Sequence, residues 1–255
     1  LHLLSRRQRQ MCIRDRNIND NCGSTHIGNL MQFVVDKKCH AGLAFDGDAD
    51  RCLAVDEKGQ LIDGDKLMAI CAKAYKEQGK LKKNTAVVTV MSNLGFTYFA
   101  KNNGIKMQTT KVGDRYVLEK MLDGGYNLGG EQSGHIIFLD EANTGDGQLS
   151  GAKVLEILAE SGKKMSELAS VMEHYPQVMI NVKISPRDRE VWKNDSQITD
   201  LIEHYENELG DSGRILVRES GTEPLIRVML EGKDFKQINE YAIAISEKIK
   251  ERAGR

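Results

Sequence analysis

The segment DGDADR places an aspartate at every second position: Asp46, Asp48 and Asp50. In extended backbone, alternate side chains project to one side, so the three carboxylates would repel one another strongly. A hard divalent cation removes that repulsion, and three carboxylate oxygens leave octahedral positions open for water or a phosphoryl oxygen, which suits Mg²⁺. Arg51 follows directly and could hold a phosphate group. The segment therefore predicts a magnesium site.

Two other interpretations of this segment stay open. An EF-hand calcium loop has oxygen ligands at fixed positions, and Leu53 and Glu57 continue the match that the aspartates begin. Arg51, however, occupies the position where that loop needs glycine for a sharp turn, and the flanking residues resemble strands and not helices. The other alternative is a solvated acidic turn between strands, a common role for Asp-rich loops.

The segment GGEQSGH presents three polar groups among glycines: the carboxylate of Glu131, the hydroxyl of Ser133 and the imidazole of His135. Glycine permits tight backbone geometry around them. A carboxylate that accepts hydrogen bonds from two hydroxyl groups can fix a hexose ring, and its charge also suits an amino sugar. We expect a sugar-binding loop, and the alternative is an ordinary hairpin turn.

The segment RESGTEP and the apolar strand pattern after it bring together two guanidinium groups, two hydroxyl groups and a glycine. The residues are Arg218, Ser220, Gly221, Thr222 and Arg227. Arginine side chains and backbone N–H groups around a glycine turn can form a cradle for phosphate. The alternative is a β-hairpin with exposed arginines.

The overall composition limits the class of protein. Of 255 residues, 36 are Lys or Arg and 37 are Asp or Glu, so no strong overall field would hold the chain on nucleic acid or an anionic membrane. No apolar run approaches the ~18 residues that a membrane span needs. Five cysteines, an odd number without C-x-x-C spacing, fit a reducing cytoplasm. We therefore expect a cytoplasmic protein with no nucleic-acid and no membrane partner.

Residues 1–16 differ in character from the rest of the chain. They carry five Arg against one Asp, and the composition changes abruptly at Asn17. We interpret this stretch as a vector or sequence-assembly remnant, with a genuine basic arm as the alternative, and exclude it from fold reasoning.

Alternating strand and helix patterns surround the three loops. Apolar runs at 42–45 and 52–55 predict strands on both sides of the acidic loop, and residues 63–78 have the apolar spacing of a helix. Further strands are expected at 86–91, 105–110, 126–130 and 135–140, and helices at 93–104, 112–122, 147–161 and 165–173. This alternation predicts a mainly parallel sheet with flanking helices.

A change of composition at Tyr175-Pro176 predicts a domain boundary. Beyond it we expect strands at 178–184, 214–218 and 225–230, and helices at 196–209 and 234–252. The predicted fold class is therefore α/β, with mixed sheets and flanking helices, followed by a C-terminal α+β domain.

The segments DGDADR, GEQSGH and RESGTEPLIRVMLEG, in this order, resemble the signature loops of the α-D-phosphohexomutase superfamily. The resemblance covers residue 18 to the C-terminus. Within the superfamily, INDNCGSTH, TKVGDRYVLEKM and Gln132 resemble the bacterial phosphoglucosamine mutase branch. The resemblance implies four domains around a cleft: the tail of the second at 17–62, the third at 63–174 and the fourth at 175–255, with the first absent.

The activity implied by this resemblance is the reversible conversion of glucosamine 6-phosphate to glucosamine 1-phosphate, which serves cell-wall amino-sugar synthesis. The reaction would pass through a phosphoserine and a glucosamine 1,6-bisphosphate intermediate. The resemblance also allows a homodimer of the full-length protein. A phosphomannomutase or phosphoglucomutase of the same superfamily is the alternative assignment.

The resemblance also gives each loop a role. The acidic loop would hold Mg²⁺ against the phosphoserine, with Arg51 supporting its phosphate; the glycine-flanked loop would hold the phosphorylated hexosamine. The RESGTEP segment and Arg227 would bind the phosphate that is not being transferred. Lys111, Asp114 and Arg115 would also reach the cleft, and Arg115 is included among the candidate catalytic residues.

No stretch resembles the T-A-S-H-N-P segment that carries the superfamily's phosphoserine. We therefore expect this chain by itself to have no mutase turnover. A non-catalytic sugar-phosphate-binding fragment remains a separate hypothesis. A Mg²⁺-dependent phosphatase with an aspartate nucleophile would leave the third aspartate and the two downstream loops unexplained.

Overall fold

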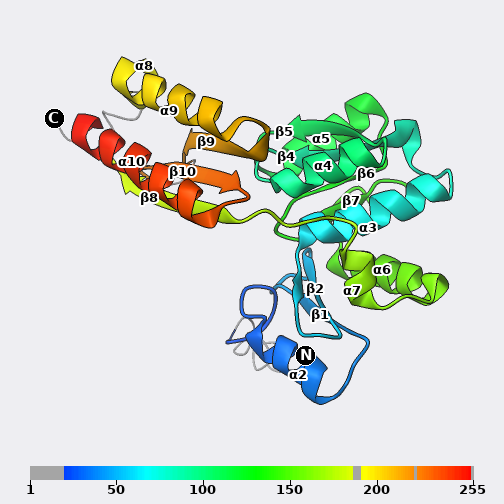
Figure 1. The fold of residues 1–255 in the computed structure, drawn as a ribbon. Coiled ribbons are helices and arrows are strands. Elements are labelled where there is room, and N and C mark those ends of the chain that lie inside the picture. Colours follow the sequence, from blue (N-terminus) through cyan, green and yellow to red (C-terminus); the bar gives the residue numbers. More distant parts are fainter. Residues whose placement is uncertain (1–19, 186–190, 221–222, 254–255) are drawn as a thin grey trace, which may run out of the picture. The chain divides into compact units, whose positions relative to one another are not determined.

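A computed structural model describes residues 20–185, 191–220 and 223–253 (Figure 1). The described chain divides into two compact units, one up to Glu173 and one from His174. Each unit has its own hydrophobic core. The finer division of the first unit at residue 62, expected from the sequence, stays a prediction.

The first unit begins with a short helix and a small antiparallel sheet. Helix α2 (Gly28–Asp36) precedes strands β1 (Ala41–Phe45), β2 (Cys52–Asp56) and β3 (Leu61–Ile62), which pair in that order. The β1–β2 register joins Phe45 to Cys52, so the acidic segment is the loop that closes this hairpin.

A four-stranded sheet forms the centre of the first unit, in the order β5-β4-β6-β7. Strand β4 (Thr85–Thr89) pairs in parallel with β5 (Lys106–Thr110) and with β6 (Leu128–Gly130), and β7 (Ile136–Phe138) pairs antiparallel with β6. A strand pattern of continuous buried residues, as in β4, is typical of a sheet covered on both faces. The expected mixed, mainly parallel sheet is confirmed.

Helices cover both faces of this sheet. They are α3 (Gly64–Glu77), α4 (Leu94–Asn102), α5 (Asp114–Gly124), α6 (Gly147–Ser161) and α7 (Met165–Ala169), with a 3-10 turn at Lys82–Asn84. Alternation along β4 sends Ala86 and Val88 into one core cluster with α3, α4, α6 and α7, and Val87 into a second cluster with α5.

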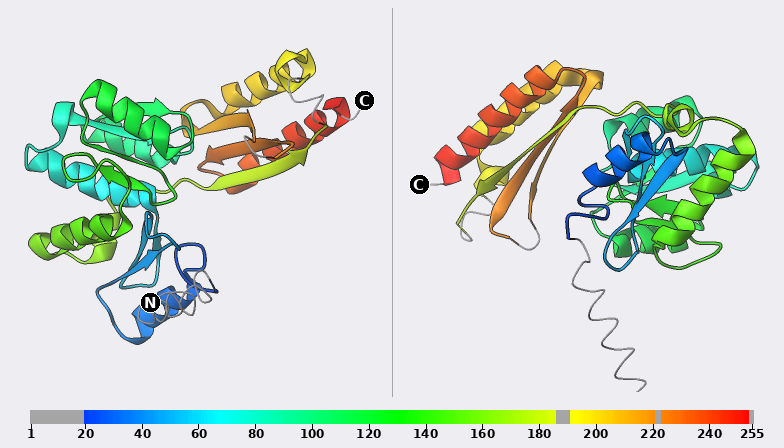
Figure 2. Two further views of the ribbon diagram at one scale, coloured as in Figure 1. Left: turned by 180° about the vertical axis from the view of Figure 1, so that it is seen from behind. Right: turned by 90° about the horizontal axis from the view of Figure 1, so that it is seen from below.

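The second unit is a three-stranded antiparallel sheet with two long helices on one face, as Figure 2 shows. Strand β10 (Leu225–Gly232) lies between β8 (Gln177–Lys183) and β9 (Gly213–Glu219). The helices are α8 (Val191–Asn194), α9 (Ser196–Leu209) and α10 (Phe235–Ala253), with a 3-10 turn at Gly210–Ser212. Buried residues of α10 recur at helical spacing: Ile238, Ala242, Ile245 and Ile249. The expected α+β unit is confirmed.

The structure differs from the sequence-based expectation in several short elements. Helix α2, strand β3 and helix α8 were not expected, and α7 is shorter than the predicted helix at 165–173. Among the described residues, no helix is both long enough and apolar enough to cross a membrane.

Candidate functional site

The acidic loop brings its three carboxylates together. One oxygen from each of Asp46, Asp48 and Asp50 lies within 4.8 Å of the others. The convergence does not come from extended backbone, as the sequence led us to expect; that expectation is wrong, because the loop is a turn. The N–H of Ala49 donates to the carbonyl of Asp46 at 3.2 Å, and Ala49 has a φ of 60°, in the left-handed region.

Arg51 compensates only part of the negative charge in this loop. Its Nε lies 3.7 Å from Asp46 Oδ2 and 4.0 Å from Asp50 Oδ1, and its backbone N–H donates to Asp46 Oδ1 at 3.1 Å. Asp50 Oδ1 is buried and has no hydrogen-bond partner. Three carboxylates beside one guanidinium, with one carboxylate oxygen left unsatisfied, form a donor set that fits a hard divalent cation such as Mg²⁺.

The surroundings of the loop do not match an EF-hand. Strands β1 and β2 flank it, where an EF-hand would have helices. Glu57, which would be the last calcium ligand, accepts hydrogen bonds from the Oγ of Ser166 at 2.5 Å and from its backbone N–H at 3.1 Å. The carboxylate of Glu57 is therefore engaged at the first turn of α7 and is not one of the three clustered groups.

Two segments far along the chain hold the acidic loop in place. The N–H of Gly147, at the start of α6, donates to the carbonyl of Ala49 at 2.9 Å, and the N–H of Cys52 donates to the carbonyl of Gly134 at 3.1 Å. Gly134 has a φ of +95°, and a Cβ there would lie 2.4 Å from the carbonyl oxygen of Cys52. Only glycine fits this position, because any side chain would push the two loops apart.

The glycine-flanked loop forms a tight turn between β6 and β7. The N–H of Gly134 donates to the carbonyl of Glu131 at 3.0 Å. Glu131 Oε1 accepts the N–H of Gly113 at 2.9 Å, and Glu131 Oε2 lies 3.4 Å from the hydroxyl of exposed Ser133. The turn therefore presents the Glu131 carboxylate and the Ser133 hydroxyl side by side, as a sugar-binding loop would require.

His135 lies beside the acidic loop. The residue is only 4% exposed, its Nδ1 lies 3.0 Å from Asp50 Oδ2, and its Nε2 accepts the N–H of Gly145 at 3.1 Å. Both ring nitrogens are thus engaged inside the first unit. In this structure the imidazole contacts the acidic loop, and the expected contact of His135 with a sugar hydroxyl stays a prediction.

Arg115 pairs with a residue of its own helix in this structure, and its place among the catalytic residues stays a prediction. Its side chain is 82% exposed on α5, and Nε donates to Glu119 Oε1 at 2.7 Å. This hydrogen bond raises the pKa of the guanidinium. Lys111 and Asp114 are exposed as well. From the segment KVGDRY, it is the backbone of Gly113 that reaches the candidate sugar loop.

The second unit places two arginines directly opposite each other. Arg218 on β9 and Arg227 on β10 are register partners. Burial, followed by the nearby charge of Arg227, lowers the pKa of Arg218. Arg227 Nε is buried without a hydrogen-bond partner, and Nη2 lies 3.5 Å from Glu223 Oε2. Two cross-strand guanidiniums with so little compensation form a strong candidate site for an anion such as phosphate.

The turn between these strands is only partly described. Ser220 is 4% exposed, its N–H donates to the carbonyl of Leu225 at 2.9 Å, and its Oγ accepts the N–H of Glu223 at 3.4 Å. Gly221 and Thr222, the other two candidate phosphate ligands of this turn, lie outside the described residues. Ser220 therefore helps to shape the turn in the structure.

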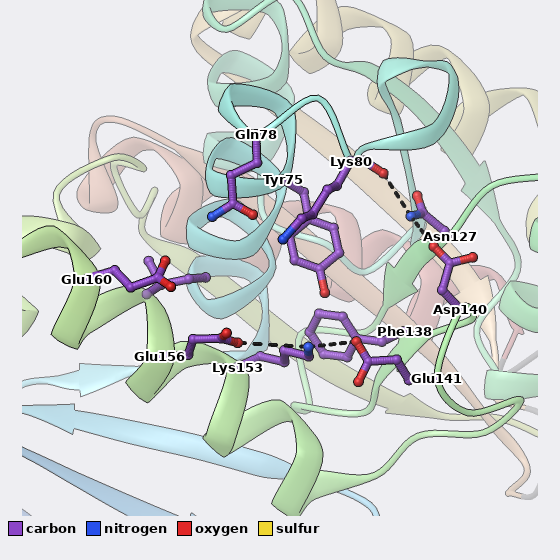
Figure 3. Close-up of a pocket in the computed structure, with 11 residues that line it drawn as sticks. Tyr75, Gln78, Lys80, Asn127, Phe138, Asp140, Glu141, Lys153, Glu156 and Glu160 are labelled. Atoms are coloured by element: carbon purple, nitrogen blue, oxygen red, sulfur yellow. Dashed lines mark hydrogen bonds and ion pairs between the residues drawn. The ribbon is translucent and has the colours of Figure 1, made fainter.

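A separate cavity of about 320 Å³ in the first unit contains none of the candidate site residues (Figure 3). Lys153 lies in it between Glu141 and Glu156, at 2.6 and 3.8 Å. Burial raises the pKa of Tyr75, which also lines the cavity, to about 12. The lysine and its two carboxylates satisfy one another, so this cavity gives no indication of a ligand.

Sequence reasoning missed three contributions to the site: the contact of His135 with Asp50, the backbone donor at Gly113 and the left-handed turn at Ala49. The glycine of KVGDRY, Gly113, could have indicated a backbone conformation that other residues rarely adopt. Nothing local to GEQSGH could indicate that its histidine faces an aspartate 85 residues earlier.

The chain resembles known proteins in its domains, its sequence and its fold. A family model described as phosphoglucomutase/phosphomannomutase, alpha/beta/alpha domain III, matches residues 63–175, and the model of the C-terminal domain of the same family matches residues 179–248. The chain is 55% identical over 238 residues to a phosphoglucosamine mutase of Acetivibrio thermocellus, covering 93% of this chain and 53% of that protein. The corresponding protein of Clostridium novyi is also 55% identical, over 237 residues, with the same coverage. The chain spans about half the length of the curated relatives it matches.

Solved structures share the fold. An N-acetylphosphoglucosamine mutase of Aspergillus fumigatus superposes with a TM-score of 0.74 at 20% identity, over 91% of this chain and 53% of that one. A structure of the same fungal enzyme in complex with GlcNAc-6P and magnesium gives a TM-score of 0.69 at 21% identity, with the same coverage. At this level of identity, the likeness concerns the fold.

Proposed function

The chain belongs to the phosphoglucomutase/phosphomannomutase family, and we propose that it carries the metal-, sugar- and phosphate-binding residues of a phosphoglucosamine mutase. The catalytic serine of that enzyme would lie outside this sequence. The relatives at 55% identity, which are phosphoglucosamine mutases, support the amino sugar as substrate over glucose or mannose.

The proposed reaction interconverts glucosamine 6-phosphate and glucosamine 1-phosphate. A phosphoserine gives its phosphoryl group to the free hydroxyl of the substrate, which forms glucosamine 1,6-bisphosphate. The intermediate then reorients, and the serine takes back the other phosphoryl group. No phosphate is gained or lost over the cycle, so the enzyme is an isomerase.

The acidic loop is the observation that carries the proposal. Its three carboxylates converge within 4.8 Å, Asp50 Oδ1 is buried without a hydrogen-bond partner, and Arg51 stands beside them. Mg²⁺ bound there would offset the charge of the transferring phosphoryl group. Arg51 would orient that group, since its side chain is 44% exposed and its guanidinium can still donate hydrogen bonds.

The other two loops would hold the substrate in position. Glu131 would accept hydrogen bonds from neighbouring sugar hydroxyls, Ser133 would donate to or accept from them, and His135 stays a candidate from the family resemblance. Arg218, Ser220, Gly221, Thr222 and Arg227 would bind the phosphate that is not being transferred. Holding the sugar and its phosphate at fixed points reduces the entropic cost of each transfer. Arg115 stays a candidate from the family resemblance, although its side chain is 82% exposed.

We also propose a cellular location, a metabolic role and an oligomeric state for the full-length enzyme. We place it in the cytoplasm, as a phosphoprotein that supplies amino sugar for peptidoglycan precursors, and as a homodimer in its full-length form. The balanced charge of 36 basic and 37 acidic residues supports a small-molecule substrate over a nucleic-acid partner.

The test is an activity assay of a complete enzyme. The N-terminal half of the Acetivibrio thermocellus relative would be joined to this chain, and interconversion of the two glucosamine phosphates would be measured with Mg²⁺. We expect turnover, a loss of about 100-fold or more in Asp48→Asn, and no loss in the exposed control Asp123→Asn. If Asp48→Asn kept its activity, the assignment of the acidic loop as the metal site would be wrong.

Two further arms of the assay address the alternatives. Glucose and mannose phosphates would serve as competing substrates, and faster turnover of either would assign the chain to another branch of the family. The unextended chain should show no turnover. Release of inorganic phosphate by the unextended chain would instead support the phosphatase alternative.

A further inference from the structure

We propose that Asp63 is a positioning residue for the glycine-flanked loop, which it holds from the start of α3 through the side chain of Gln132. The inference rests on the proposed function of this loop in sugar binding. Asp63 and Gln132 are 69 residues apart in the sequence. They meet because α3, which Asp63 caps, lies beside β6, and the loop directly follows β6 (Figure 1).

The two carboxylate oxygens of Asp63 have different partners. Oδ1 accepts the backbone N–H of Lys66 at 3.0 Å, which caps the start of α3. Oδ2 lies 3.5 Å from Nε2 of Gln132. A carboxylate accepts hydrogen bonds and does not donate them, so Gln132 directs the N–H side of its amide group toward Asp63. Asp63 therefore binds the helix with one oxygen and the loop with the other.

A backbone contact holds the same residue of the loop a second time. The N–H of Gly64, the first residue of α3, donates to the carbonyl of Gln132 at 3.0 Å. The two segments approach so closely that a Cβ at Gly64 would lie 2.2 Å from the carbonyl oxygen of Glu131 and 2.5 Å from the nitrogen of Gly134. Only glycine permits this approach, which brings the side chain of Gln132 within reach of Asp63.

The start of α3 is itself held firmly in the first unit. Asp65 is fully buried, and its Oδ2 accepts the backbone N–H of Asn93 at 2.7 Å. Asn93 in turn caps α4 by accepting the N–H of Gly95 at 2.9 Å. The next residues of α3, Leu67 and Met68, are fully buried in the core. A support that is fixed by packing and hydrogen bonds can hold a binding loop in one position.

Gln132 lies at the centre of the turn that presents the proposed sugar-binding groups. The N–H of Gly134 donates to the carbonyl of Glu131 at 3.0 Å, so Gln132 and Ser133 are the two central residues of this turn. Contacts to the carbonyl and the side chain of Gln132 fix the central peptide plane, and with it the placement of Glu131 and Ser133. Asp63 should therefore affect sugar binding without touching the sugar.

A pair of substitutions separates the contact with the loop from the helix cap. Asp, Asn and Ser are about equally effective as N-caps, so Asp63→Asn and Asp63→Ser both keep the start of α3. In Asp63→Asn, Oδ1 can cap the helix while Nδ2 donates to Gln132, once the amide group of Gln132 has turned over. The hydroxyl in Asp63→Ser is too short to reach Gln132. Both variants remove the charge, so a role in capping alone would make them equal.

The first experiment measures kcat and KM for glucosamine 6-phosphate in the complete enzyme described above. We expect Asp63→Ser to raise KM by about 3- to 10-fold and to change kcat by less than about 2-fold. Asp63→Asn should keep KM within about 2-fold of wild type. Gln132→Met, which has a similar volume but no amide group, should match Asp63→Ser. The double variant Asp63→Ser/Gln132→Met should be no worse than either single variant, because both remove the same contact.

The outcomes distinguish this inference from the proposed function. An unchanged KM in Asp63→Ser, or equal KM values in Asp63→Ser and Asp63→Asn, would overturn the positioning role and leave the proposed function intact. Additive effects of Asp63→Ser and Gln132→Met would also overturn it. If the wild-type complete enzyme does not interconvert the glucosamine phosphates, the proposed function is wrong, and the second experiment decides whether Asp63 holds the loop.

The second experiment measures amide hydrogen exchange of this chain by NMR and needs no substrate. The N–H of Gly134 closes the turn, so its exchange reports how often the turn opens. We expect exchange about 3- to 10-fold faster in Asp63→Ser and Gln132→Met than in wild type and Asp63→Asn, with unchanged rates for the amides of β4. Equal exchange of Gly134 in all four chains would show that Asp63 does not hold the loop.

Discussion

The backbone N–H of Gly113 donates a hydrogen bond to Glu131 Oε1 at 2.9 Å, although 18 residues separate the two. Gly113 directly precedes α5 and has a φ of +130°, a conformation that residues with a Cβ rarely adopt. The donor is therefore aimed by backbone geometry and not by a side chain. This hydrogen bond helps to orient the Glu131 carboxylate. The segment KVGDRY therefore contributes to the candidate sugar loop through the backbone N–H of Gly113.

Replacing Gly113 with alanine should impair sugar binding. The left-handed conformation costs alanine roughly 1 kcal/mol or more, so the N–H is expected to move away from Glu131. In the complete enzyme we expect a higher KM for glucosamine 6-phosphate. The matched control is Gly79→Ala, where φ is also positive, at +70°, but the position lies at the end of α3 with nothing within 4 Å. Equal KM values in the two variants would contradict the prediction.

Removing one arginine of the cross-strand pair should stabilise the second unit. Like charges directly opposite each other destabilise a sheet, so Arg218→Gln should raise its unfolding free energy by about 0.5 kcal/mol. Trp192, the one tryptophan of the sequence, packs against the core of this unit, and its fluorescence can follow the transition.

The same variant should lose its response to phosphate. Inorganic phosphate is expected to raise the unfolding temperature of the wild-type unit but not that of Arg218→Gln, because only the pair neutralises the anion. Arg252→Lys, which alters an arginine paired with Asp195 elsewhere in the unit, is the control and should respond as wild type does. A phosphate response that survives in Arg218→Gln would argue against the cradle.

The buried thiols of the first unit should be chemically inert. Burial raises the pKa of Cys52 and of Cys71 to about 12, so at about pH 8 hardly any thiolate is present. Exposed Cys22 should react with iodoacetamide in the native chain, and Cys52 and Cys71 only after unfolding in urea. Peptide mass spectrometry gives the order of modification. Rapid labelling of Cys52 in the native chain would mean that β2 opens readily.

At low pH the protein should lose the small amount of unfolding free energy that the ionised Asp140 side chain contributes. Hydrogen bonds from Lys82, and then from the side chain of Asn127, lower the pKa of this carboxyl group. A folded pKa below the unfolded one stabilises the protein above the unfolded pKa of about 3.9, and the contribution disappears as the pH falls through the folded pKa. Because Asp140 is 48% exposed, we expect less than about 1 kcal/mol.

The measurement for Asp140 is the unfolding free energy of wild type and Asp140→Asn as a function of pH. Hydrogen exchange of the β4 amides reports on the first unit specifically. The difference between the two chains should be present at about pH 7 and vanish in strong acid. A difference that is independent of pH would show that the ion pair contributes nothing and that the loss comes from the hydrogen bond to Asn127.

The long helices were well predicted from the sequence because their end signals are local. Helix α6 runs from Gly147 to Ser161 as expected; Asp146 caps its start, and Gly162, in the left-handed conformation, ends it. Helix α9 likewise spans the predicted residues after its cap, Asp195. Helix α2 was missed; its N-cap, Ile27, makes no side-chain capping hydrogen bond, so the sequence carries no local start signal there.

The three loops were also found from residue types, but their internal geometry was not. Convergence of the three aspartates depends on the left-handed turn at Ala49, a residue that gives no sign of it in the sequence. The orientation of His135 depends on Gly145 and Asp50, which come from two different loops. Such contacts arise from tertiary packing, and neither periodicity nor propensity encodes them.

The contacts around the acidic loop also constrain when the loop can form during translation. The β1–β2 hairpin is local and leaves the ribosome early, but the partner of Asp50 is synthesised 85 residues later, and Gly147 later still. Long-range contacts of this kind form slowly because a long chain segment must first be ordered. The three carboxylates should therefore stay unorganised in the nascent chain, and competence for a divalent cation should appear only once the start of α6 has emerged and docked.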